Sequence, residues 1–65
     1  MTTYRTYRVQ GRDYMVWSDF IMRATYAQDL GTLSTRKIHG NGYIHNDLTV
    51  RKAIARAYGL DSFRK

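Results

Sequence analysis

The absence of cysteine is the feature that most constrains how this chain can fold. A domain of 65 residues buries only about 60% of the surface that its unfolded chain exposes, and many small domains are stabilised by disulfides or metals. Without cysteine, neither a disulfide framework nor a cysteine-based zinc site can form. We therefore expect apolar packing within a single domain, residues 1–65, with a homodimer as a second way to complete the core.

The remaining composition is typical of a globular, cytoplasmic protein. Hydrophobic residues make up 43% of the chain and proline is absent, which argues against disorder. No apolar run approaches the roughly 18 residues that a membrane-spanning helix requires. The segment Met1–Arg5 lacks the apolar core of a signal peptide. These features predict a cytoplasmic location and no membrane partner.

Residues 3–9 are rich in strand-forming side chains. The alternation of side chains in a strand separates two sets, namely Tyr4, Thr6 and Arg8 on one face and Arg5, Tyr7 and Val9 on the other. Neither set is purely apolar, which predicts an edge strand or an exposed strand. Residues 10–13 are typical of a turn, and residues 14–17 can pair back as a second strand.

Residues 18–30 have the spacing of an amphipathic helix. Ser18 is suited to cap this helix, Asp19 suits its positive N-terminal end, and Gly31 can end it. One apolar stripe is predicted along it, formed by Phe20, Ile21, Ala24 and Ala27. In the alternative interpretation, the second strand continues through residues 20–22.

Residues 33–46 predict a β-hairpin, because Asn41-Gly42 favours a turn in which both central residues take positive φ. In that register His39 and His45 would point to opposite faces and could not bind one metal ion.

Residues 48–58 form the clearest predicted helix. Asp47 is suited to cap it and to pair with Arg51, and Gly59 suits the left-handed position that ends a helix. Together, the segments predict an α+β fold, with two helices packed on one face of a small antiparallel sheet made of the N-terminal strand or strands and the 33–46 hairpin.

The formal charge of +6 is concentrated at the two ends of the chain. Residues 1–12 hold three arginines and no acid, and residues 48–65 hold five cations and one aspartate, whereas residues 13–47 hold three cations and four aspartates. A solvated surface is one explanation, but clustering at the ends favours an anionic partner.

Catalysis finds little support in the sequence. The chain has no cysteine and no glutamate, and its two histidines, His39 and His45, are predicted to diverge. A nucleophile with its base, a carboxylate pair or a metal cluster would be the usual requirement. We therefore expect neither an enzyme nor a bound cofactor or metal.

The first candidate binding cluster lies on the N-terminal strand and contains Tyr4, Arg5, Tyr7, Arg8 and Arg12. Arginine can contact phosphates or base edges, and an exposed tyrosine can stack on an unpaired base. The sequence leaves open the alternative that the tyrosines pack into the core while the arginines are solvated.

The second candidate cluster lies on the last helix and the chain end, and contains Arg51, Lys52, Arg56, Arg64 and Lys65. Such a helix could lie along a phosphate backbone or could be a solvated face. The two clusters predict a nucleic-acid-binding module for DNA or RNA, such as a small regulator or accessory factor of phage or mobile-element type. The alternative is a small inhibitor or adaptor that docks on a protein, for example a nucleic-acid-processing or defence enzyme.

Overall fold

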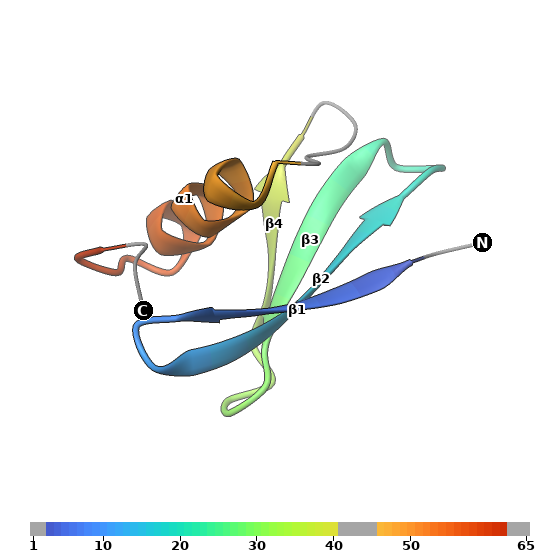
Figure 1. Ribbon diagram of the computed structural model, residues 1–65. Coiled ribbons are helices and arrows are strands. Elements are labelled where there is room, and N and C mark those ends of the chain that lie inside the picture. Colours follow the sequence, from blue (N-terminus) through green and yellow to red (C-terminus); the bar gives the residue numbers. More distant parts are fainter. Residues whose placement is uncertain (1–2, 41–45, 63–65) are drawn as a thin grey trace.

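The computed structural model describes residues 3–40 and 46–62, which form a four-stranded antiparallel sheet and one helix (Figure 1). Each strand pairs with the next along the chain, so the sheet order is β1-β2-β3-β4. The elements are β1 (Tyr4–Val9), β2 (Arg12–Asp19), β3 (Ala24–Asp29), β4 (Thr35–His39) and α1 (Asp47–Ala57). The described part of the chain is therefore a mostly-β domain, and the prediction of two helices on one face of the sheet is wrong.

The first hairpin forms as the sequence predicted, but its turn is shorter than residues 10–13, because Arg12 and Asp13 belong to β2. Gln10 and Gly11 form its turn with φ of 54° and 73°, as a two-residue turn with positive φ at both central positions requires. Val9 then pairs with Arg12, and β2 extends beyond the predicted second strand to Asp19. β1 is an edge strand, which the mixed character of its two faces had predicted.

The predicted helix over residues 18–30 is replaced by the end of β2, a turn and β3. Ser18 does not cap a helix, because its hydroxyl lies 2.9 Å from that of Thr25 on the neighbouring strand. The carboxylate of Asp19 accepts hydrogen bonds from the amides of Ile21 and Met22 and so stabilises the turn between the strands. The residues of the predicted apolar stripe do not share one face, because Phe20 and Ile21 lie exposed in the turn whereas Ala24 and Ala27 are buried in β3.

β4 pairs with β3, with a register shift between Thr25 and Tyr26. Gly31 lies in the connecting turn, where its amide donates to the carboxylate of Asp29 (2.8 Å), and does not end a helix. The predicted Asn41-Gly42 turn lies outside the described residues, as does His45. A strand therefore occupies residues 35–39 as predicted, but its partner in the structure is β3.

Both ends of helix α1 are capped. A side chain accepts from a free amide at the N-terminal end, and backbone amides donate to free carbonyls at the C-terminal end. Asn46, not Asp47, is the N-cap, and its side chain accepts from the amide of Thr49 at 3.1 Å. Asp47 instead accepts a hydrogen bond from the hydroxyl of Tyr7 at 2.9 Å. The C-terminal end follows the prediction, because Gly59 has a φ of 67° and the amide of Leu60 donates to the carbonyl of Ala55.

Replacing Asn46 with alanine should lower the free energy of unfolding by about 1 kcal/mol, because the amide of Thr49 loses its acceptor. Asn46→Asp is the matched control, since aspartate caps helices as well as asparagine. Urea unfolding monitored by circular dichroism measures both variants. Equal stability of Asn46→Ala and the wild type would show that the cap contributes nothing.

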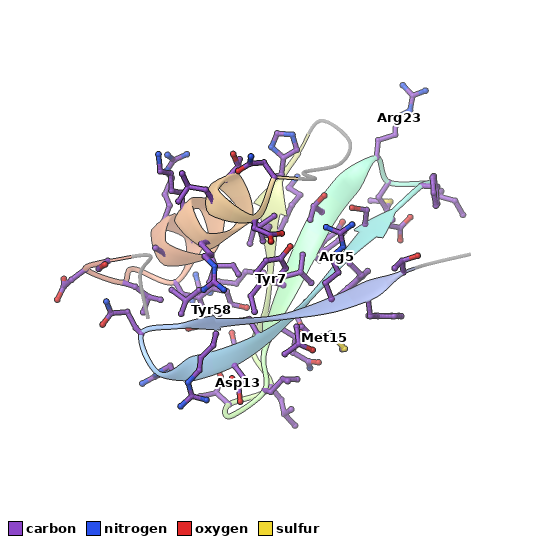
Figure 2. The ribbon with its side chains drawn as sticks, viewed as in Figure 1. Arg5, Tyr7, Asp13, Met15, Arg23 and Tyr58 are labelled. Carbon is purple, nitrogen blue, oxygen red and sulfur yellow. The ribbon has the colours of Figure 1, made fainter. Side chains whose placement is uncertain are left out.

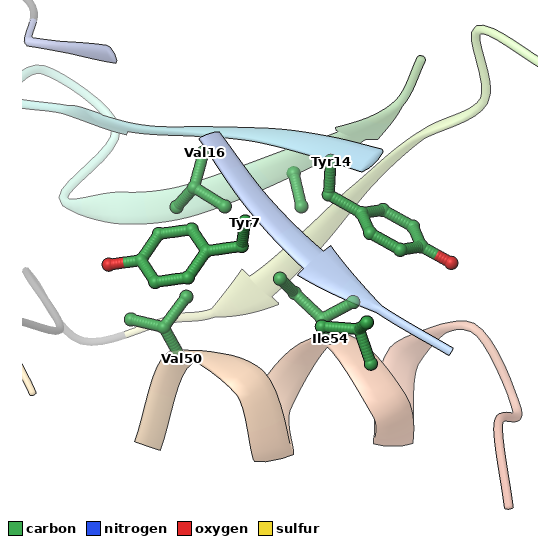
Figure 3. Close-up of a cluster of buried hydrophobic side chains, with 7 residues drawn as sticks. Tyr7, Tyr14, Val16, Val50 and Ile54 are labelled. Atoms are coloured by element: carbon green, nitrogen blue, oxygen red, sulfur yellow. The ribbon is translucent and has the colours of Figure 1, made fainter. Parts of the chain in front are cut away.

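The core lies between α1 and one face of the sheet (Figure 3). Side chains from the strands pack there against side chains from the helix. Partly buried Ile38, Tyr58 and Leu60 pack against the edge of this core. The central cluster consists of Tyr7, Val9, Tyr14, Val16, Ala27, Val50 and Ile54. Because α1 covers only this side of the sheet, the side chains that alternate with these core residues face the opposite side.

Candidate nucleic-acid interface

The side of the sheet opposite α1, here called the open face, carries side chains from all four strands. Figure 2 shows Met15 on this side and Tyr7 on the helix side, as the register of β1 and β2 requires. The side chains that define the open face are each exposed or half-buried. The open face consists of Tyr4, Thr6, Arg8, Asp13, Met15, Trp17, Tyr26, Gln28, Thr35 and Lys37.

Three aromatic rings form a row across the open face. The strand register places Tyr4 opposite Trp17 and Trp17 opposite Tyr26. The ring centroids of Tyr4 and Trp17 are 5.7 Å apart, and those of Trp17 and Tyr26 are 6.0 Å apart and nearly parallel. Tyr4, on the edge strand, is 57% exposed. Lys37, on β4, is the register partner of Tyr26, on β3. A cation therefore stands at the end of the aromatic row.

A second row, parallel to the aromatic row, is mainly polar. It runs through Thr6, Met15, Gln28 and Thr35, which are successive partners in the strand register. Gln28 also donates to the carbonyl of Leu33 at 3.3 Å. Hydroxyl and amide groups beside a row of rings can hydrogen-bond to the edges of bases stacked on those rings.

Beyond the polar row, Arg8 lies 3.1 Å from Asp13 on the open face. Both side chains are about half exposed or more, so the ion pair is weak and can be exchanged for a phosphate contact. Together, the aromatic row, the polar row and this ion pair offer aromatic faces, hydrogen-bonding groups and cations on one face of the sheet.

The structure divides the predicted strand cluster between several locations. Tyr4 and Arg8 lie on the open face, whereas Tyr7 is 6% exposed in the core and is not available to stack on a base. Arg5 lies on the helix side of β1 (Figure 2). Arg12 pairs with the buried carboxylate of Asp29 at 3.3 Å.

Arg51 belongs to the seam between β1 and α1. Its guanidinium lies over the ring of Tyr7, 5.6 Å from the centroid, and donates to the carbonyl of Arg8. Arg5 lies near the same seam, where its interaction with the hydroxyl of Tyr7 raises the pKa of the arginine. Members of both predicted clusters therefore lie at this seam. The side chain of Arg51, however, is engaged in contacts that join the helix to the sheet.

The rest of the predicted helix cluster lies away from the open face. Lys52 and Arg56 are exposed on α1, which packs on the other side of the sheet. Arg56 is in the last turn, where a cation also interacts favourably with the helix dipole. Arg64 and Lys65 lie outside the described residues.

Sequence reasoning missed most of the open face. The interpretation of residues 18–30 as a helix concealed Tyr26, and Trp17 and Lys37 were not linked to Tyr4. The signal that could have found them is the alternation Tyr14-Met15-Val16-Trp17, which separates a core side from a solvent side in β2. Their assembly into one row depends on pairing across strands that are distant in sequence.

Comparisons with protein-family models, curated proteins and solved structures find no match to this chain. In the part of the chain that the structure describes, no helix has the length and apolar character needed to cross a bilayer. The geometry of the described residues therefore carries the functional proposal.

Proposed function

We propose that the chain binds single-stranded nucleic acid, with bases on the open face of its sheet. The observation that supports this proposal is the row of three contacting aromatic rings that ends at Lys37. Proteins that bind single strands commonly combine aromatic rings, on which unpaired bases stack, with cations that contact the backbone. A cytoplasmic location, as expected from the sequence, would give the chain access to such strands.

A single strand fits this surface better than a duplex, because rings can stack only on base faces that are not already stacked. Tyr4 is the most open ring of the aromatic row and lies on the edge strand, where a base can approach from outside the sheet. The polar row beside it can contact base edges, and Arg8 and Lys37 are exposed for phosphates.

Cross-strand aromatic pairs also stabilise sheets, by roughly 0.2–1 kcal/mol each. A purely structural aromatic row would therefore lose stability, and nothing else, when a ring is removed. The two roles can be separated at Tyr4, because its exposure makes the expected cost to folding small while its expected contribution to base stacking is large.

The test uses the fluorescence of Trp17, the one tryptophan in the chain, which lies inside the proposed site. Single strands of DNA and RNA about 12 nucleotides long are titrated at two salt concentrations. Binding should quench Trp17 and weaken with salt, and two to three phosphate contacts would give a log–log slope of about −1.4 to −2.1.

We expect Tyr4→Ala to weaken single-strand binding by about 5- to 150-fold, equivalent to the 1–3 kcal/mol of one lost base stack. Tyr4→Phe is the matched control, because it keeps the ring and should bind like the wild type. Urea unfolding of both variants checks that the fold is intact.

Unchanged affinity of folded Tyr4→Ala would contradict stacking on the aromatic row. If wild type binds no strand even at low salt, the nucleic-acid proposal fails, and the open face is better explained by the alternative expected from the sequence, a surface that docks on a protein.

A further inference from the structure

The turn between β2 and β3 presents three consecutive apolar side chains to solvent. Phe20, Ile21 and Met22, here called the apolar tip, are 59%, 91% and 63% exposed. Apolar runs of this kind are unfavourable on a soluble surface unless they contact something.

The backbone of the apolar tip is held in place from within the turn. One oxygen of the Asp19 carboxylate accepts from the amide of Ile21 at 2.9 Å and from the amide of Met22 at 3.0 Å. Arg23 follows with a φ of 53°, a conformation that is strained for a residue with a side chain. The turn therefore holds the backbone of the apolar tip in a defined conformation, next to Arg23 in the chain.

The apolar tip lies at the end of the sheet that carries the aromatic row. Trp17 lies two residues before the end of β2, and Tyr26 two residues after the start of β3, so each is about 7 Å along its strand from the turn. β1 begins at the same end with Tyr4 (Figure 1). A strand stacked on the aromatic row would bring its neighbouring nucleotides to the tip.

We propose that the apolar tip stacks on the terminal base pair of a duplex adjoining the bound strand, so that the preferred ligand is a junction between single and double strands. This inference rests on the proposed function. The face of a terminal base pair is the flat, apolar surface that nucleic acid presents beside a single strand, and apolar side chains of these types pack against base steps in known complexes.

The local charges agree with this occupant. Arg23 extends outward from the tip, where it can meet a phosphate of the duplex (Figure 2). The carboxylate of Asp19, the nearest acid along the chain, is engaged by two backbone amides of the same turn.

The experiment compares four ligands by Trp17 fluorescence at one salt concentration. They are a single strand, two junctions in which the same strand extends from the 5′ or the 3′ end of a closed duplex hairpin, and a blunt duplex. Wild type should bind one of the junctions about tenfold more tightly than the single strand. Ile21→Ser should reduce junction affinity to the single-strand level and leave single-strand affinity unchanged. The matched control is Leu33→Ser, which replaces an apolar residue that is 65% exposed in the turn at the opposite end of the sheet, and it should keep the junction preference.

Equal affinity of wild type for junctions and single strands would overturn this inference and leave the proposed function intact. Junction preference that persists in Ile21→Ser would also overturn it. Binding of wild type to anionic vesicles that depends on Ile21, without junction preference, would assign the apolar tip to a lipid surface. Absence of binding to all four nucleic acids would reject the proposed function and this inference together.

Discussion

Tyr7→Ala should lower the free energy of unfolding by about 3–5 kcal/mol, the usual cost of removing a buried aromatic side chain. The ring of Tyr7 lies between Val16 on the sheet and Val50 on α1 (Figure 3), and Arg51 covers it. A domain of 65 residues has a total stability of only about 3–10 kcal/mol. The variant should therefore be largely unfolded or close to it, as measured by circular dichroism and urea unfolding.

Tyr7→Phe separates this structural role from the stacking role that the sequence suggested. It keeps the ring and removes only the hydroxyl that donates to Asp47, which should cost about 0.5–1.5 kcal/mol. Because Tyr7 faces the core, folded Tyr7→Phe should bind single strands like the wild type. Near wild-type stability of Tyr7→Ala would contradict the placement of this ring in the core.

The parts of the fold that could be predicted depend on local signals. Gln10 and Gly11 adopt the positive φ that their turn requires. The alternation over residues 4–9 correctly placed Tyr7 and Val9 on a different face of the strand from Tyr4. Helix α1 carries its buried residues Val50 and Ile54 and its terminal Gly59 within one short segment. In each case the residues that determine the local structure lie within the segment itself, so the sequence of that segment is enough to predict it.

Residues 18–30 could not be assigned in the same way, because their apolar spacing suits more than one structure. Ala24 and Ala27 fit a helix stripe, but both are also buried in a strand. The deciding interactions are the pairing of β3 with both β2 and β4, and the latter pairing requires residues that come later in the chain. The aromatic row could not be predicted for the same reason, because Tyr4, Trp17 and Tyr26 come together only through pairing between three strands.

Charge counts along the sequence also failed to identify which cations are available for binding. Arg51 and Arg36 each donate to a backbone carbonyl, and Arg12 pairs with Asp29. Lys37, which the sequence did not single out, is exposed at the end of the aromatic row. Clustering of cations in the sequence therefore does not show which of them are exposed on one face of the folded chain.

The turn between β3 and β4 is organised by the buried carboxylate of Asp29. It accepts from the amides of Gly31 (2.8 Å) and Thr32 (3.3 Å) and from Arg12 (3.3 Å). Asp29→Ala leaves both amides without this acceptor and removes the partner of Arg12, so we expect a loss of about 3 kcal/mol in the free energy of unfolding. Urea unfolding at neutral pH measures this loss, and a change below experimental error would contradict the proposed role.

The same carboxylate should make stability depend on pH. Burial alone would raise the pKa of Asp29, but the amides of Gly31 and Thr32, together with Arg12, outweigh burial and hold that pKa below its ordinary value. Because the folded state favours the ionised form, this stabilisation is fully present above the unfolded pKa of about 3.9 and is lost as pH falls through the lower folded pKa.

Asp29→Asn tests this directly, since its amide oxygen can still accept from the turn but cannot titrate. From pH 6 down to pH 2, a range that spans the pKa of an unfolded aspartate at about 3.9, wild type should lose more stability than Asp29→Asn does. The matched control is Asp61→Asn, which removes an exposed carboxylate just after α1 and should leave the wild-type pH dependence in place. Parallel pH profiles for wild type and Asp29→Asn would show that ionised Asp29 does not stabilise the turn, and that its hydrogen bonds from Gly31 and Thr32 need only a neutral acceptor.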